Sequence, residues 1–346
     1  MYFLLFLASF QVPSEAAWMI QETGCYQPIH AQQLAVAPDG RVYILTKDPP
    51  YILHFNSEGQ LVQSFAERGS GPGALDKPRY LWFYQDRLFA VDFKNIQSFS
   101  LEGEHLDMQK IPQGLFIKGR VSTGWIGQRM DLTDVQTTTH GIWDESLTSP
   151  IMTIHTNAKP IPRGGKIEAF QPRTLVTHSN DGRFIFLNPQ GTTEIRIIHV
   201  ESQATREVVT LEPRKIPITQ DMIEKFEERL KSSRARSMGG LDRKIKLTYP
   251  EFLPDFIFLK TLATGEVVLT RRTNNEEKAE YLYFNEDGQL AEAPVWDPSI
   301  LSRMLRIQGN WAYLGLWDEE LEEAAIAKVA LQKVASFFAK GSGDPP

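Results

Sequence analysis

The sequence predicts an all-β chain built from repeated four-stranded sheets, and three observations carry that prediction. Short segments in which apolar and polar residues alternate recur along the chain, and a period of two is typical of strands with one buried face. Glycine-centred turns separate these segments, and two of them, Glu58-Gly59 and Glu102-Gly103, lie 44 residues apart, the length of one four-stranded repeat. A glycine-rich connection, Arg68-Gly69-Ser70-Gly71-Pro72-Gly73, links the first repeat to the second.

The first two repeats are the most regular. The first predicts strands at 32–37, 41–46, 51–56 and 60–66, and the second at 79–84, 87–92, 95–101 and 104–111. Asp39-Gly40 and Glu58-Gly59 supply turns, because glycine accepts a positive φ without a Cβ clash. We interpret Asp92, followed by Lys94-Asn95, as a turn residue rather than a calcium or catalytic carboxylate.

The later repeats are less uniform. The third, about 113–156, is irregular and its turns are not obvious. The fourth predicts strands at 173–179, 183–188, 193–200 and 206–211, and the fifth at 255–262, 266–272, 280–285 and from 289 onward.

The last repeat shows only three strands, at 301–308, 311–317 and 325–331. A helix from 318 through 339 is the alternative for the third of them, because its glutamates are good helix formers. The position in the repeat favours a strand, with a short helical tail after Gln332. An unpaired sheet edge promotes aggregation, so we expect the N-terminal segment 18–23 to complete this sheet.

With these turns and this connection, the sequence resembles the NHL-type six-bladed β-propeller proteins of bacteria. The resemblance covers about 32–331 and is sharpest across the first two repeats. It implies an all-β, six-bladed β-propeller over 17–331 with a central channel, whose N-terminal strand closes the last blade, followed by a C-terminal tail at 332–346. It implies no single function, because this scaffold carries many.

A segment between blades four and five, 213–247, breaks the period. We predict a helix at about 220–233, with Thr219 as N-cap and Asp221 near the positive end of the helix dipole. One apolar stripe at helical spacing supports it, formed by Met222, Ile223, Phe226 and Leu230.

This insertion is also basic. From 214 to 246 there are ten Lys or Arg against five Asp or Glu, although the whole chain has a net charge of −6. One interpretation is a solvated helix face; the other is a lid or clamp for an anionic ligand or partner. The candidate binding residues are Arg229, Lys231, Arg234 and Arg236.

The N-terminus predicts export to the periplasm or the outside of the cell. Residues 1–10 are nearly all apolar, and Ser14-Glu15-Ala16 places small residues where a signal peptidase cleaves, so we expect a signal peptide over 1–16, although no Lys or Arg precedes the apolar run. No run is long enough to span a membrane, and the mild net charge gives no reason to expect nucleic acid. The single cysteine, Cys25, excludes an intrachain disulfide.

Motifs for catalysis are missing from the sequence. The glycine-rich connection lacks the ending of a phosphate loop, no Gly-x-Ser-x-Gly elbow occurs, and none of the seven histidines pairs at metal-ligand spacing. His178, near the end of an inner strand, is the most plausible channel-facing histidine, although a core or turn role is commoner. We therefore assign no catalytic residue, no metal ligand and no cofactor.

Two functions follow from this pattern. The first is a non-enzymatic recognition scaffold that binds a protein, peptide or glycan, anionic where it meets the insertion, on the loop face of the propeller. The alternative is a metal-dependent hydrolase or lyase of the lactonase-like propeller type, with Ca²⁺ or Zn²⁺ in the central channel.

Overall fold

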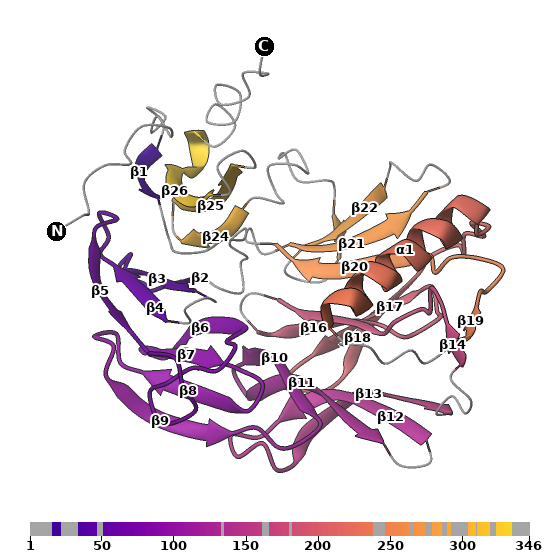
Figure 1. Cartoon of the computed structure of the whole chain (residues 1–346), viewed down its shortest axis with the longest axis horizontal. Coiled ribbons are helices and arrows are strands. Elements are labelled where there is room, and N and C mark those ends of the chain that lie inside the picture. The colour runs from indigo at the N-terminus through magenta and orange to yellow at the C-terminus, as the bar shows by residue number, and fades with distance from the viewer. Residues whose placement is uncertain are drawn as a thin grey trace. The chain divides into compact units, whose positions relative to one another are not determined.

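In the computed structural model the chain is mainly β-sheet, with one α-helix and one short 3₁₀ helix in the described part (Figure 1). Six four-stranded sheets follow one another along the chain, which is the architecture of a six-bladed β-propeller and confirms the predicted fold class. The structure describes residues 16–21, 34–46, 51–132, 135–160, 166–179, 182–237, 246–262, 266–273, 279–285, 289–291, 304–308, 310–318 and 323–333. The predicted signal peptide lies outside these residues except for Ala16.

The chain divides into two compact units. Unit 1 contains residues 1–118, 262–264 and 294–346, and unit 2 contains residues 119–261 and 265–293. Each unit holds its own apolar clusters between neighbouring sheets.

The first two sheets of unit 1 match the prediction closely. Their strands are β2 (Leu34–Val36), β3 (Val42–Leu45), β4 (Ile52–Phe55) and β5 (Leu61–Phe65), then β6 (Tyr80–Tyr84), β7 (Arg87–Val91), β8 (Asn95–Phe99) and β9 (His105–Lys110). Tyr43 and Leu81 share one apolar cluster between the sheets, and the Tyr43 hydroxyl donates to the Leu101 carbonyl at 2.9 Å. The packing is close at Gly103, which has φ +85° and where a Cβ would come within 2.7 Å of the Phe65 ring.

Side chains fix the glycine-rich connection between these two sheets. The buried Gln97 donates to the carbonyls of Gly71 and Ala74, at 3.0 and 2.7 Å, and accepts from the Gly73 amide at 3.1 Å. Asp92 accepts from the amides of Lys94 and Asn95 at 2.6 and 2.7 Å. The turn role predicted for Asp92 is therefore confirmed.

The N-terminal strand completes the last sheet, as predicted. Strand β1 (Ala16–Gln21) pairs antiparallel with β26 (Glu323–Ala330), which follows β24 (Met304–Gln308) and β25 (Trp311–Asp318). Because residues 323–330 form a strand, the alternative of a long helix over 318–339 is wrong. After this strand only the 3₁₀ turn Leu331–Lys333 is described. Ile20 and Ile326 pack in one cluster with Val42 and Ile44 of the first sheet.

Unit 2 holds most of the third sheet and all of the fourth and fifth. The strands are β10 (Leu115–Val121), β11 (Gly124–Leu132), β12 (Val135–Trp143), β13 (Pro150–Pro160), β15 (Leu175–His178), β16 (Phe184–Asn188), β17 (Glu194–His199), β18 (Thr205–Thr210), β20 (Phe256–Thr261), β21 (Val267–Arg272), β22 (Ala279–Phe284) and β23 (Leu290–Ala291). Ile126 and Ile185 join the third sheet to the fourth, and Phe186 and Phe284 join the fourth to the fifth.

The insertion lies within unit 2, between the end of β18 in the fourth sheet and the start of β20 in the fifth. It contains helix α1 (Gln220–Ser237), whose start agrees with the prediction and whose end lies four residues later. The Thr219 hydroxyl accepts from the Met222 amide at 3.3 Å, as an N-cap does. After the helix, β19 (Lys246–Thr248) pairs in parallel with β14 (Lys166–Glu168), a pairing that the sequence pattern did not indicate. In the described part of the chain, no helix is long and apolar enough to cross a membrane.

Candidate functional site

Four chain connections meet at one end of the fourth sheet. The pairs Leu175–Asn188 and Glu194–Thr210 place the start of β15, the β16–β17 turn and the end of β18 at the same edge. The segment before β20 lies there too, because the Leu253 amide donates to the Ile216 carbonyl at 2.9 Å and the Arg214 amide donates to Asp255 at 3.1 Å. We call residues 170–173, 188–193, 211–217 and 250–256 the loop end of unit 2.

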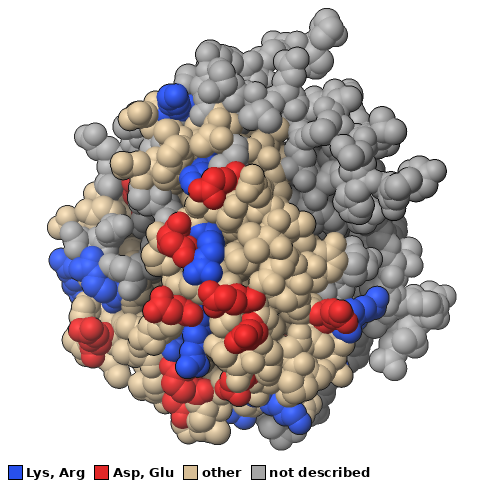
Figure 2. All heavy atoms as spheres, turned by 90° about the vertical axis from the view of Figure 1, so that its left-hand side faces the viewer, with Lys and Arg blue, Asp and Glu red and all other residues tan. Residues whose placement is uncertain are grey.

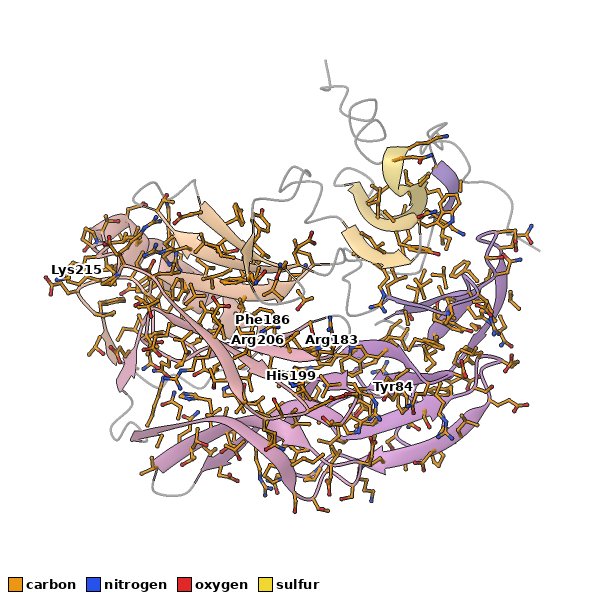
Figure 3. The ribbon with its side chains drawn as sticks, turned by 180° about the vertical axis from the view of Figure 1, so that it is seen from behind. Tyr84, Arg183, Phe186, His199, Arg206 and Lys215 are labelled. Atoms are coloured by element: carbon orange, nitrogen blue, oxygen red, sulfur yellow. The ribbon has the colours of Figure 1, made fainter. Side chains whose placement is uncertain are left out.

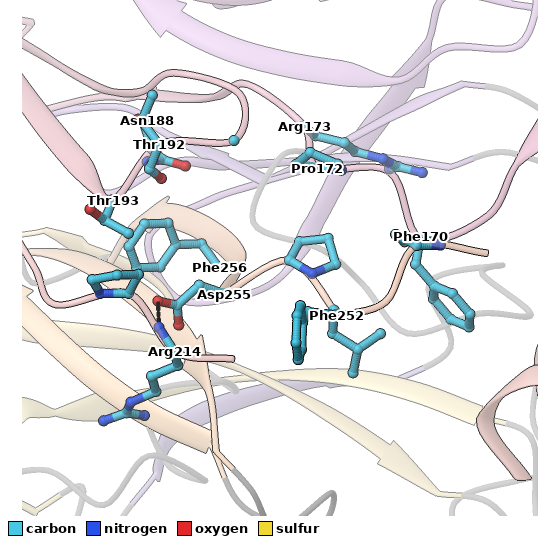
Figure 4. A pocket seen from close by; sticks show the side chains of 15 residues that line it. Phe170, Pro172, Arg173, Asn188, Thr192, Thr193, Arg214, Phe252, Asp255 and Phe256 are labelled. Carbon is cyan, nitrogen blue, oxygen red and sulfur yellow. Dashed lines mark hydrogen bonds between the residues drawn. The ribbon is translucent and has the colours of Figure 1, made fainter. Parts of the chain in front are cut away.

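The loop end encloses a cavity of about 330 Å³ (Figure 4). Its walls are mostly apolar: three phenylalanines, one leucine and four prolines contribute beside a few polar side chains. The lining residues are Phe170, Pro172, Arg173, Asn188, Gly191, Thr192, Thr193, Pro213, Arg214, Pro250, Phe252, Leu253, Pro254, Asp255 and Phe256. The proline ring fixes the φ angle at four positions of the lining, which restricts the backbone around the cavity.

The insertion supports one wall of the cavity. The Phe170 ring lies 4.8 Å from the Phe226 ring of α1, and the Tyr249 hydroxyl donates to Glu227 of the same helix at 2.7 Å. Burial, and then the bond to Glu227, raises the pKa of Tyr249 to about 12, so its hydroxyl stays protonated as a donor. Phe170 has φ +53°, which costs a non-glycine residue about 1–3 kcal/mol and is found where surrounding structure enforces it.

A buried ion pair closes the cavity on the side of the fifth sheet. Arg271 Nε and Nη2 donate to the two carboxylate oxygens of Asp255, both at 2.8 Å, and the side chains are 7% and 10% exposed. Arg271 also donates to the Glu212 carbonyl. The bond to Asp255 raises the pKa of Arg271 above its usual value. Both oxygens of the cavity's carboxylate are thus occupied by donors from the fold.

Most other polar groups of the lining are also paired within the fold. Asn188 donates to the carbonyls of Thr192 and Glu194 at 3.1 and 2.8 Å, and the Thr192 hydroxyl donates to the Pro189 carbonyl at 3.0 Å. Arg214 donates to the Arg272 carbonyl at 2.8 Å and forms an ion pair with Glu280. Within the described residues, Arg173 and Thr193 are the two lining residues whose side-chain polar groups have no hydrogen-bond partner.

Arg173 contributes positive charge that the fold leaves exposed. Its side chain is at the surface, and in the view of Figure 4 it lies on the side of the lining away from Arg214. Burial lowers the pKa of Lys159; Glu168 opposes this shift, and repulsion from Arg173 makes a smaller contribution that lowers the pKa further. Lys159 Nζ donates to Gln171 Oε1 at 3.0 Å, which holds this second cation beside the loop end.

The face of the molecule shown in Figure 2 differs from the loop end in its charge distribution. The face shown in Figure 2 carries acidic and basic side chains interspersed. In unit 1, for example, Arg41 pairs with Asp39 at 2.7 Å and with Glu102 at 3.2 Å.

At the opposite end of the fourth sheet, Arg183 and Arg206 lie near His199 (Figure 3). Their guanidinium groups are 5.6 and 5.4 Å from the centre of the Phe184 ring, so cation–π contacts hold them.

Arg229, Lys231, Arg234 and Arg236 fall within α1, but their side chains lie outside the described residues, so their binding role stays a prediction. His178 ends β15, away from the cavity; its Nδ1 lies 2.9 Å from the Ser179 carbonyl oxygen, and its ring packs against Gly119, where a Cβ would come within 2.5 Å of Nε2. Over the described ranges, no three His, Cys, Asp or Glu side chains are grouped to hold a metal ion.

Sequence reasoning missed the cavity itself. Phe170 and Phe252 come from connections 82 residues apart, and no local pattern joins them. One signal was present: a proline stands beside the sheet in each of the four participating connections, at Pro172, Pro189, Pro213 and Pro254.

The fold and this cavity define the chain as a six-bladed β-propeller with an insertion beside a loop-end pocket. Neither a protein-family model nor a curated protein sequence matches the chain. Among solved structures it is similar to a Bacteroides fragilis protein thought to be exported (11% identity, 93% of this chain and 97% of the other, TM-score 0.43). It is also similar to the Pan2 WD40 domain of Neurospora crassa (9%, 91% and 94%, TM-score 0.41) and to a member of the DUF4221 family from Bacteroides vulgatus (10%, 90% and 96%, TM-score 0.40). At these values the likenesses carry no argument about function, and the fold assignment rests on the sheets of the chain itself.

Proposed function

We propose that the protein is a non-enzymatic recognition scaffold that binds a protein, peptide or glycan at the loop end of unit 2. The preformed, largely apolar cavity of about 330 Å³ is the observation that carries the proposal. Packed sheets hold the surrounding loops at fixed positions, so a partner that meets them avoids most of the ordering cost of binding.

The chemistry of the cavity supports binding rather than catalysis. A general acid or base must exchange a proton with the substrate, which requires a free position on the catalytic group. Asp255 is the one carboxylate among the described lining residues, and three of its roughly four acceptor positions are filled by Arg271 Nε, Arg271 Nη2 and the Arg214 amide. We also propose that the propeller is of the NHL type, and the glycine–proline connection with its glycine-centred turns supports this proposal.

The proposal includes the basic insertion as part of the binding face. A capture experiment compares the wild type with a variant that carries Arg229→Glu, Arg234→Glu and Arg236→Glu. The matched control carries Arg68→Glu, Lys77→Glu and Arg87→Glu, three exposed cations of unit 1. We expect the wild type and the control variant to capture the partner and the insertion variant to fail to do so. Equal recovery of one partner with all three proteins would exclude the insertion from the binding face.

We also propose that the protein is exported. Strand β1 begins at Ala16, so cleavage near this residue leaves the strand in the mature chain. Intact-mass analysis of protein from the native host tests this: we expect a mature chain that starts near Ala17, and a cytoplasmic chain that still begins at Met1 would contradict export.

A further inference from the structure

We infer that the loop-end cavity receives a large apolar side chain from an acidic linear peptide of the partner, and not a sugar. This inference rests on the proposed function and narrows its three classes of partner to one. Three properties of the described residues support it: the pairing of the polar groups, the exposed positive charge of Arg173 at the rim, and the size of the cavity.

The pairing of polar groups disfavours a sugar. A buried sugar presents many hydroxyl groups, and each one that loses water without gaining a partner weakens binding. Asp255, Asn188, Thr192 and Arg214 already make their bonds within the fold. An apolar side chain needs no hydrogen-bond partner, and its burial against Phe170, Phe252 and Phe256 contributes favourably to the free energy of binding.

The charge at the rim favours acidic residues beside the apolar one. Arg173 is exposed and has no ion-pair partner within the described residues. Its charge also makes a small contribution to lowering the pKa of Lys159, although burial and the opposing Glu168 have larger effects on that lysine. An incoming carboxylate would accept a charge-assisted hydrogen bond from the Arg173 guanidinium group. The same charge disfavours a basic peptide.

The size of the cavity favours one or two side chains. A volume of about 330 Å³ corresponds to roughly eleven water molecules and lies at the small end of ligand pockets. The four prolines of the lining limit its ability to widen. An extended peptide that crosses the loop end can insert one aromatic or aliphatic residue and keep its acidic neighbours at the rim.

The test uses fluorescent heptapeptides of one length and defined composition. The central residue is Phe, Leu or Ala and the two flanking residues are Asp, Ser or Lys, and binding is measured by fluorescence polarisation beside an array of neutral and acidic oligosaccharides. We expect Asp-flanked Phe and Leu peptides to bind at least fivefold tighter than Ala-centred or Lys-flanked ones, with no oligosaccharide bound.

Two variants locate the binding. Arg173→Gln should weaken the Asp-flanked peptides about fivefold and flatten their salt dependence, and it should keep the preference for a Phe centre. Thr193→Trp places a ring in the cavity and should abolish that preference. Arg87→Gln, an exposed arginine of unit 1, is the matched control and should change neither. Hydrogen exchange with wild-type protein gives a readout that needs no variant: the Phe peptide should protect 250–256.

Other results would overturn the inference. Peptides that bind equally well whatever their centre, or none that bind above background, would exclude an apolar-anchor site. If the wild type binds oligosaccharides and Thr193→Trp abolishes that binding, the cavity is a sugar site. That result would refute this inference and leave the proposed function intact. Peptide protection confined to unit 1 would place the peptide site elsewhere, whereas failure of the proposed function shows separately in the capture experiment.

Discussion

Replacing Asp255 by Ala removes the carboxylate that pairs with Arg271 beneath the cavity. The two bonds of 2.8 Å and the Arg214 amide bond of 3.1 Å are lost together. A guanidinium group with 7% exposure then keeps its charge with Glu280, 3.9 Å from Arg271 Nη1, as its remaining carboxylate neighbour among the described residues. Breaking a buried pair by removing one partner costs about 3–5 kcal/mol, because the remaining charge is not solvated. We therefore expect the free energy of unfolding to fall by that amount.

This loss is large enough to measure by calorimetry. Unfolding entropy is about 2.1 cal/mol/K per residue, so for 346 residues that unfold together the melting temperature should fall by about 4–7 °C. The control is Asp221→Ala, which breaks the exposed pair of Asp221 and Lys225, 2.6 Å apart and 61% and 60% exposed; it should cost less than about 1 kcal/mol.

A double-mutant cycle decides whether the pair itself is responsible. Arg271→Met alone should also be destabilising, because it leaves the Asp255 carboxylate buried, and the double variant should lose at least about 2 kcal/mol less than the sum of the single ones. Additive losses, or a cost of Asp255→Ala no larger than that of Asp221→Ala, would refute the reasoning.

Three further predictions concern stability and the insertion. Burial first, and then Arg41, lowers the pKa of His54; below about pH 6.5 the unfolded chain therefore binds a proton that the folded chain does not. The free energy of unfolding should fall as pH drops from 6.5 toward the folded pKa, by up to about 1.4 kcal/mol per pH unit, and His54→Phe should reduce this slope in urea titrations; an unchanged slope would contradict the assignment. Ile20→Ala should cost about 2–4 kcal/mol, because the side chain is 4% exposed in the cluster that joins the first and last sheets; a loss below 1 kcal/mol in the same titrations would mean that β1 is not needed. Limited proteolysis should cut first within 214–246 and slow down with an acidic peptide, and early cuts elsewhere that the peptide does not affect would favour a solvated helix face.

The strands were predictable from sequence wherever their signals are local. Gly40, Gly59 and Gly103 all have positive φ at the turns expected of them, and the three-strand count of the last repeat was enough to assign the N-terminal segment to it. The turns of the third repeat were not predictable, because the turn at 144–149 contains no glycine. Asp144 organises that turn by accepting from the Thr148 amide at 3.0 Å, and Leu147 takes the left-handed conformation with φ +59°.

The cavity was not predictable because its parts are joined only by the fold. Strands β14 and β19 have only three residues each, which is too short to show an alternating pattern. Their pairing is parallel and non-local, so no turn signal links them either. From the sequence, Asp255 is expected at the start of one strand and Arg271 within the next, with nothing to connect them. The register of β20 and β21, in which Phe256 pairs with Arg271, brings the two residues together. The helix of the insertion was predictable because its N-cap, acidic first turn and apolar stripe all lie within twelve residues, 219–230.

Because β1 pairs with β26, the last sheet cannot be completed until nearly the whole described chain has been synthesised. Strand β1 leaves the ribosome first, and its partner begins at Glu323, about 300 residues later, which at roughly 5–20 residues per second takes about 15–60 s. Throughout that time the N-terminal strand must stay unpaired or be held by a chaperone. A chain that terminates before Glu323 never acquires the strand opposite Ile20 and keeps a permanently open sheet edge, so unfinished copies expose a feature by which proteases can distinguish them from complete ones.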